Sequence, residues 1–565
     1  MQHLFLGTNY GHGSSVALIN DLGELIFAVE EGRLINENNS NKFPIHSLQL
    51  ACEKAGTSPV FWAEGWHTYR RLFYKGLFQS LKYGWQDRIY FTHRLLKELH
   101  RFYNGRYNYK EWLNTLQAQR VYLSGHHLAH AYSLLPWGLP PKSLIWVSDT
   151  TAEKESISSF YWSGRRMLPI FSSMYPHSIG SIYHQFAYHV GFPGQTGPGK
   201  LMALSSLGEP LWRKELESIG AVIDGRFYVN LKKYPAWKIK GGWFDFANQH
   251  SNNLFKNELL SSYQNYELGI NLAASIQEWF TKTTIKAIYQ VTHKVRKEFK
   301  LDVHHLGLAG GAALNCLANG NIIRNIGGLD IESVIVSPWS DDPGTAIGAA
   351  AWICHQKSPD IVFKPASVFL GPTACIQTKK SISENDINSA VIALINGKPI
   401  ALVSGKLEFG PRALGGRCIL ANPQDNDIVK KLNTLKKRPS FMPFAPVVRD
   451  EDFAVYFNGK GSSNMAWTVS AKTHTLKYIP AATHVSRESR VQVLKKGEAI
   501  LLYKILTEFK SKTNCGLLLL TSLNGNGEAI PASLTVAETT ARRLGLAGLI
   551  CDTGWKDFKD SAHIP

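Results

Sequence analysis

The feature that most constrains the fold is a repeated unit, in which a short apolar run leads into a loop of Gly or Asp and then into a helix-forming segment. Residues 306–315 and 334–351 both follow this scheme, and residues 143–149 supply a further apolar run that ends in an acidic residue. Strands that alternate with helices favour a parallel α/β sheet. Because such sheets place their chemistry beyond the carboxyl ends of the strands, we expect functional residues in these loops.

Two histidines and two aspartates lie at such positions. His126 and His130 are four residues apart, so they share one face of the helix that we predict there. Asp149 ends the strand predicted at 143–148, and Asp342 follows the apolar run at 334–336. We interpret these four residues as a mixed nitrogen and oxygen metal site, suited to iron, manganese or zinc. The alternative is a half-buried, histidine-rich helix without a metal.

Glycine-rich loops in the first half of the chain indicate phosphate binding. Strands predicted at 4–6, 16–19 and 25–29 enclose a loop with His12, which suits the phosphate-handling face of an actin-like ATPase fold. The loop 191–200 ends in Lys200 and could hold an anion through backbone amides. Gly310 and Gly311 would let a helix N-terminus approach a phosphate or an adenosine, although a tight strand–helix crossover is the alternative.

The length of 565 residues predicts two or three domains. A polar linker at about 356–380 separates residues 1–360 from a second α/β domain at 361–565. Basic residues of this second domain would suit a site for phosphate or carboxylate oxygens, with surface charge as the alternative. They are Arg412, Arg417, Lys436, Arg438 and Arg490.

Residues 58–118 differ in texture, because Trp, Tyr and Phe alternate there with Lys and Arg. We predict an insertion in the first domain. Its aromatic side chains could stack on nucleobases, pack as amphipathic helices on the core, or form a lid over a substrate pocket. The formal net charge of +18 favours acidic ligands or nucleic acid, although many enzymes are basic without binding either.

Composition also bears on the compartment. The sequence has no apolar run of the roughly eighteen residues that a membrane helix needs, and its first residues lack the basic region of a signal peptide. Seven cysteines are scattered without a C-x-x-C motif, which indicates reduced thiols. We therefore expect a cytoplasmic protein without a membrane partner.

Taken together, the motifs resemble those of the O-carbamoyltransferase family, which includes the tobramycin, cephamycin and nodulation carbamoyltransferases. They run in family order from residue 7 to about residue 535. The matching motifs are Gly11-His12, Glu30-Glu31-x-Arg33, Lys42-Phe43-Pro44, His126-His127-x-x-His130-Ala131, Gly199-Lys200-x-Met202, Ala309-Gly-Gly-Ala-Ala-Leu-Asn315, Asp342-x-Gly-x-x-x-Gly-Ala-Ala350, Glu408-Phe-Gly-Pro-Arg-Ala-Leu-Gly415, Pro443-Phe-Ala-Pro446, Arg490-Val-Gln492 and Thr521-Ser522-x-Asn524.

This resemblance implies an α/β protein with two domains. The first would have the actin-like ATPase fold and be similar to the threonylcarbamoyladenosine transferase (TsaD-like), and the second would be a YrdC-like α+β domain. The second domain would condense carbamoyl phosphate with ATP to carbamoyl adenylate and pyrophosphate. The first would pass the carbamoyl group to a hydroxyl of a small-molecule natural product. The implied cofactors are a divalent metal, Fe²⁺ before Mn or Zn, together with ATP and Mg²⁺.

The resemblance also assigns residue roles. His126, His130, Asp149 and Asp342 would bind the metal. Lys200, a catalytic candidate, would hold the nucleotide together with Gly310, Gly311 and Asn315, and His12 is our candidate for the base at the acceptor. The residues implied for the carbamoyl phosphate and ATP site are Arg412, Lys436, Arg438, Arg490 and Ser522.

Two departures from the family pattern stand out. The family's Asp-Gly-x-Gly is Asp149-Thr-Thr-Ala152 here, and an arginine expected before Pro443 is Met442. A tRNA-modifying threonylcarbamoyl-type transferase and an idle scaffold are the rival functions. The fused second domain, which the tRNA enzyme lacks, favours a small-molecule acceptor over nucleic acid. A homodimer stays open.

Overall fold

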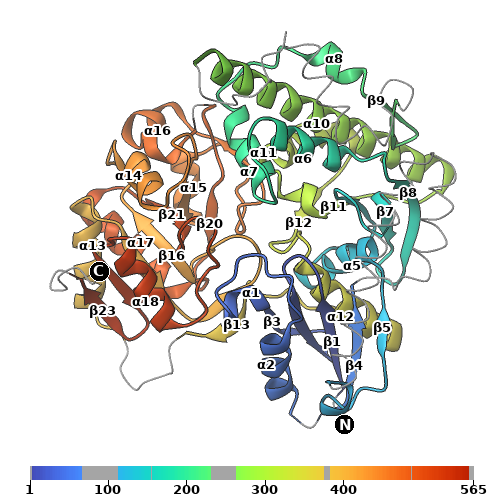
Figure 1. The fold of residues 1–565 in the computed structure, drawn as a ribbon, viewed down its shortest axis with the longest axis horizontal. Coiled ribbons are helices and arrows are strands. Elements are labelled where there is room, and N and C mark those ends of the chain that lie inside the picture. The colour runs from blue at the N-terminus through green and yellow to red at the C-terminus, as the bar shows by residue number, and fades with distance from the viewer. Residues whose placement is uncertain are drawn as a thin grey trace. The chain divides into compact units, whose positions relative to one another are not determined.

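The computed structural model describes residues 3–56, 58–65, 112–153, 155–230, 263–374, 382–484 and 486–558. Helices and strands alternate along most of this length, so the expected α/β class is confirmed (Figure 1). None of the helices in these ranges is both long and apolar enough to cross a bilayer.

Two five-stranded sheets share one strand order. The first sheet contains β1 (Leu4–Asn9), β2 (Ser15–Asn20), β3 (Leu25–Glu30), β4 (Val60–Glu64) and β5 (Val121–Leu123). The second contains β6 (Ser143–Ser148), β7 (Glu155–Trp162), β8 (Met167–Met174), β11 (His305–Ala309) and β12 (Ser333–Val336). Their orders are β3-β2-β1-β4-β5 and β8-β7-β6-β11-β12. In both sheets the last three strands of this order, β1-β4-β5 and β6-β11-β12, are parallel to one another. This duplicated arrangement is that of the actin-like ATPase fold, as predicted.

The helices around these sheets pack closely. They are α5 (His126–Tyr132), α6 (Ile179–His189), α7 (Gly197–Ser205), α8 (Arg213–Glu217), α10 (Tyr263–Glu298), α11 (Cys316–Asn325) and α12 (Gly344–Lys357), with β9 (Gly220–Ile223) and β10 (Arg226–Val229) as a hairpin. α12 packs between β1 and α5. A Cβ at Gly7 would collide with the α12 backbone, and one at Gly348 would collide with the backbone of Ala129 in α5. These glycines therefore fix the distance of α5 from the sheet.

A seven-stranded mixed sheet organises the rest of the chain. Its strands are β14 (Ile400–Val403), β16 (Arg417–Ala421), β17 (Ala445–Arg449), β20 (Gln492–Leu494), β21 (Leu517–Ser522), β22 (Gly548–Cys551) and β23 (Gly554–Asp557), in the order β20-β17-β21-β16-β14-β22-β23. Only the β17–β20 and β14–β22 pairs are parallel. This mixture agrees with the α+β character expected of the second domain.

Helices and two small sheets complete this part of the chain. The helices are α13 (Glu384–Ile395), α14 (Ile428–Leu435), α15 (Asp450–Tyr456), α16 (Thr473–Tyr478), α17 (Ile500–Thr513) and α18 (Leu534–Arg543). The small sheets pair β13 (Phe369–Thr373) with β15 (Lys406–Glu408), and β18 (Val469–Ser470) with β19 (Glu488–Ser489), both antiparallel.

By internal contacts the chain forms two compact units. The first comprises residues 1–10, 16–25 and 49–366, and the second comprises 11–15, 26–48 and 367–565. α1 (Glu31–Leu34) and the first residues of α2 (Ile45–Ala55) therefore belong with the second unit, whereas α2 from Gln49 onward belongs with the first. A local sequence pattern cannot reveal such packing, because it depends on contacts hundreds of residues away.

The start of the predicted insertion is corrected by β4. Trp62 is fully buried in this strand and donates its indole N–H to Thr8 Oγ1 at 3.1 Å. It belongs to the sheet core and not to a lid or an amphipathic insertion. The error arose because an aromatic strand and the aromatic residues after it share one composition. Residues 66–111 lie outside the described residues, so this part of the predicted insertion is not placed.

Candidate functional site

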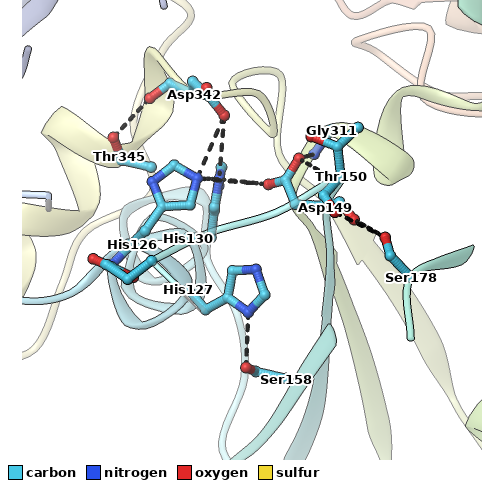
Figure 2. Close-up of polar contacts among 11 residues, drawn as sticks. His126, His127, His130, Asp149, Thr150, Ser158, Ser178, Gly311, Asp342 and Thr345 are labelled. Carbon is cyan, nitrogen blue, oxygen red and sulfur yellow. Dashed lines mark hydrogen bonds and ion pairs between the residues drawn. The ribbon is translucent and has the colours of Figure 1, made fainter. Parts of the chain in front are cut away.

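The four predicted metal ligands converge in the first unit (Figure 2). α5 begins at His126, directly after Gly125, and presents His126 and His130 on one face. Asp149 follows β6 immediately, and Asp342 lies in the loop that leads into α12. Their ligand atoms all lie within 4.8 Å of one another. The sheet and α12 thus bring together residues from three separate segments.

Distances within this cluster are short. His130 Nε2 lies 3.2 Å from Asp149 Oδ2, and His126 Nε2 lies 3.5 Å from Asp342 Oδ1. The two Nε2 atoms are 3.2 Å apart. Both imidazoles are buried, with 1% and 0% of their surface exposed. All four groups therefore direct their donor atoms at one small volume.

The charges of the two carboxylates and the two imidazoles stabilise one another in this buried volume. Burial alone would lower the pKa of His126, but the carboxylates of Asp149 and Asp342 raise it to about 10. Burial would raise the pKa of both carboxyls, but the imidazoles hold both pKa values below their usual range. With neutral imidazoles the cluster carries two negative charges. Two imidazole nitrogens and two carboxylate oxygens therefore fit a divalent transition metal.

Surrounding groups hold the ligands in place. Asp149 Oδ1 accepts the backbone N–H of Gly311 at 3.2 Å, and Thr345 donates its hydroxyl to the carbonyl of Asp342 at 2.7 Å. The His127 ring contacts Ser158 Oγ at 2.7 Å and lies on the far side of His126 from Asp342 (Figure 2). Such outer groups orient metal ligands.

Glu153 is a supporting residue that the sequence reasoning missed. Its Oε1 accepts the backbone N–H of His126 at 2.9 Å, at the N-terminus of α5, where Gly125 offers no side chain as a cap. A carboxylate is favourable at this end of a helix. The available signal was an acidic residue in the loop that begins at Asp149, but its partner could not be inferred from spacing.

Gly310, Gly311 and Asn315 lie between β11 and α11, at the same edge as Asp149. Gly310 has a φ of 84°, and a Cβ there would collide with the backbone of Ser148. Asn315 accepts the N–H of Ala318 at 3.0 Å and so caps α11. Its amide also exchanges hydrogen bonds of 3.0 and 3.1 Å with Gln277. Their nucleotide-binding role stays a prediction.

Lys200 and His12 are placed differently. The prediction that the glycine-rich loop continues to Lys200 is wrong, because α7 begins at Gly197 and Lys200 lies in its first turns, half-buried. Pro198 is compatible with this start, since a helix tolerates proline in its first turn. His12 lies exposed in the loop between β1 and β2, which packs with the second unit. Both catalytic roles stay predictions.

Predicted basic residues gather in the second unit. Lys436 Nζ donates to the carbonyls of Ser522 and Asn524 at 2.5 and 2.6 Å, and to Asn524 Oδ1 at 3.0 Å. Burial lowers the pKa of Lys436 to about 7, and the charge of Arg438 adds to this effect. Burial also lowers the pKa of Arg438 to about 10, with a further contribution from the charge of Arg490. We call Lys436, Arg438 and Arg490 the cation cluster.

The remaining arginines of this unit have separate surroundings. Arg412 lies half-buried in the loop between β15 and β16. Arg417 is fully buried and donates to the carbonyls of Ser404, Gly405 and Gly416 at 2.8 to 3.2 Å. The interpretation of Arg417 as a substrate ligand is therefore corrected, since its guanidinium stabilises the backbone at the start of β16.

Two protein-family descriptions match this chain. The family described as "Carbamoyltransferase N-terminus" matches residues 4–351, and the family described as "Carbamoyltransferase C-terminus" matches residues 391–555. Both parts of the chain are therefore covered, and the first match includes all four residues of the His/Asp cluster.

Two curated relatives align over nearly the whole chain. The nodulation protein NolNO of Sinorhizobium fredii is 26% identical over 97% of this chain and 79% of its own length. The 3'-hydroxymethylcephem-O-carbamoyltransferase of Amycolatopsis lactamdurans is 24% identical over 96% of this chain and 97% of its own. Among solved structures, a Sua5 variant of P. abyssi is 19% identical over 33% of this chain and 51% of its own, with a TM-score of 0.24.

Proposed function

This chain belongs to the carbamoyltransferase family, and we propose that it is an ATP-dependent O-carbamoyltransferase that acts in two steps. The first step forms carbamoyl adenylate in the YrdC-like second domain. The second step transfers the carbamoyl group to a hydroxyl of a small molecule in the actin-like first domain. The observation that carries this proposal is that a His/Asp cluster and a separate cation cluster occur on one chain.

The cation cluster suits the first step. Carbamoyl phosphate and ATP are both polyanions, and Arg438 and Arg490 would bind their oxygens. Lys436, whose Nζ already donates to Ser522 and Asn524, would contribute its positive charge. In the balanced reaction the carbamoyl oxygen bonds to the α-phosphorus of ATP and pyrophosphate leaves. The phosphoryl group of carbamoyl phosphate is released to water as inorganic phosphate. Ser522 and Arg412 are the further residues that we assign to this site.

The His/Asp cluster suits the second step. The acceptor oxygen would bond to the carbamoyl carbon, AMP would leave, and the hydroxyl proton would pass to a base, for which His12 is our candidate. His126, His130, Asp149 and Asp342 would hold a divalent metal, with iron as our first choice. A bound divalent metal supplies positive charge to oxygen atoms that become more negative during transfer. Lys200, Gly310, Gly311 and Asn315 are our candidates for holding the nucleotide portion.

A hydroxylated natural product is the proposed acceptor class. The name of the Amycolatopsis lactamdurans relative supports it, since that protein is called an O-carbamoyltransferase of a hydroxymethyl cephem. A match to the carboxy-terminal family over residues 391–555 favours this reading over a tRNA-modifying transferase. Retention of four convergent ligands argues against an idle scaffold.

The direct test is product detection. Purified protein is incubated with ATP, Mg²⁺, carbamoyl phosphate and a panel of hydroxylated metabolites, and mass spectrometry follows carbamoyl adenylate and carbamoylated acceptors. The proposal predicts carbamoyl adenylate even without an acceptor. The proposal would be refuted if metal-loaded protein formed no carbamoyl adenylate and no carbamoylated acceptor and left the ATP intact.

A further inference from the structure

The loop between β15 and β16, residues 409–416, carries Arg412 and is held by residues from the amino-terminal part of the chain. Glu30 and Arg33 belong to the segment 26–48, which packs in the second unit together with this loop. We propose that Arg33, paired with Glu30, is a positioning residue that sets the conformation of the Arg412 loop for carbamoyl-adenylate formation. The proposal rests on the function proposed above for Arg412.

Arg33 grips the beginning of the loop. Its Nη1 donates to the carbonyl of Glu408 at 2.5 Å, and its Nη2 donates to the carbonyl of Gly410. Glu30 Oε1 pairs with Arg33 Nη2 at 2.9 Å and accepts the N–H of Gly410 at 3.3 Å. The backbone of Gly410 is thus bound on both its N–H and its carbonyl. Gly410 has a φ of 108°, a conformation that favours glycine and that these contacts maintain.

The end of the loop is held by its own neighbours. Glu408 Oε1 accepts the backbone N–H groups of Leu414, Gly416 and Arg417 at 3.0 to 3.2 Å. Gln492 Nε2 donates to the carbonyl of Leu414 at 2.8 Å, which ties the loop to β20, two residues after Arg490. Both ends of the loop that carries Arg412 are therefore held by hydrogen bonds, and Arg33 provides those on the amino-terminal side.

The burial of Arg33 and Glu30 makes their contacts with the loop sensitive to substitution. The side chains of Arg33 and Glu30 are only 5% and 13% exposed. A surface ion pair contributes little, but removal of one partner from a buried pair leaves an uncompensated charge. The forked guanidinium donates to two carbonyls at once from two nitrogens. A lysine ammonium has a single nitrogen and cannot reproduce this geometry. Retention of positive charge alone should therefore not preserve the loop.

The kinetic test measures pyrophosphate release from ATP and carbamoyl phosphate without an acceptor. Arg33→Ala should lower kcat/KM on the order of tenfold or more, chiefly by raising KM for carbamoyl phosphate, since several charge-assisted hydrogen bonds are lost. Arg33→Lys should recover only a small part of the loss. Guanidinium at millimolar concentration should restore Arg33→Ala but not Arg412→Ala. Arg165→Ala is the matched control, because its guanidinium is 72% exposed and pairs with an exposed Asp360.

Hydrogen–deuterium exchange reports on the loop without reference to the chemistry. Arg33→Ala should exchange faster in residues 409–416, while peptides from the first unit exchange as in the wild type. Glu30→Gln, which keeps the side-chain shape and the arginine, should give a smaller change of the same kind and serves if Arg33→Ala does not fold.

Three outcomes separate the possible failures. Wild-type protein without pyrophosphate release would refute the proposed function, and the exchange experiment would still decide whether Arg33 orders the loop. Active wild type with unchanged KM and unchanged exchange in Arg33→Ala would overturn the positioning role. A fall in active protein with unchanged KM and no guanidinium rescue would also overturn it, because this pattern indicates a general loss of stability.

Discussion

Gly311 donates its backbone N–H to Asp149 Oδ1 over 3.2 Å, which links the glycine pair after β11 to the proposed metal ligand after β6. The two strands are parallel neighbours, with Ala309 opposite Val147, so their carboxyl ends lie side by side at one edge of the sheet. The loop that we assign to nucleotide binding and the ligand that we assign to the metal are therefore in direct contact. A change in one should affect the other.

The first prediction uses this contact. A Cβ at Gly311 would lie 2.9 Å from Asp149 Oδ1, so Gly311→Ala should push the carboxylate from its position. We expect a loss on the order of tenfold in metal affinity, the scale found when groups that orient metal ligands are changed. Metal content after dialysis against a competing chelator measures the effect. Gly327→Ala is the control, since nothing lies within 4 Å of its Cβ position. Equal metal retention in both variants would contradict the coupling.

A second prediction concerns Glu153. Its carboxylate accepts the N–H of His126 and places negative charge at the N-terminus of α5. Glu153→Ala should weaken metal binding by roughly tenfold, and Glu153→Gln, which keeps an acceptor but loses the charge, should do so less. Calorimetric titration of metal-free protein with metal compares these variants with Glu298→Gln on α10. Among the described residues, the Glu298 carboxylate pairs with the side chain of Lys294 at 3.5 Å. Similar metal affinities for all variants would show that Glu153 does not support the metal site.

Asp149 and Glu153 also show what could and could not be predicted from the sequence. Asp149 was assigned because a carboxylate at the end of an apolar strand has a known place in α/β sheets. The duplicated strand order was not predicted, since it depends on pairing between strands far apart in the chain, such as β6 with β11. Glu153 and Arg33 were not assigned, since their partners depend on how loops return to the sheet or on residues hundreds of positions away. Trp62 was misread because composition does not distinguish an aromatic core strand from an aromatic insertion.

A third prediction follows from the pKa of Lys436, which burial lowers to about 7. A bound polyanion stabilises the charged ammonium and raises this pKa, so at pH 8 the neutral amine takes up a proton on binding. ATP affinity should therefore fall as the pH rises from about 7 to 9, and binding at pH 8 should be accompanied by proton uptake. Calorimetry in two buffers of different ionisation enthalpy measures this uptake. Lys436→Arg, whose charge does not titrate, should abolish it, and an unchanged uptake in that variant would assign the proton elsewhere.

The most direct test of the central claim, that activation and transfer use separate sites, is a comparison of His130→Ala with Arg490→Ala. Pyrophosphate, carbamoyl adenylate and carbamoylated acceptor are measured in the same reaction, with metal content determined beside them. His293→Ala, a change at an exposed histidine on α10, serves as the control. We predict that His130→Ala lacks bound metal and product but still forms pyrophosphate and carbamoyl adenylate, whereas Arg490→Ala keeps its metal and forms neither. Product formation at the wild-type rate by Arg490→Ala, or loss of pyrophosphate release by a folded His130→Ala, would contradict the account.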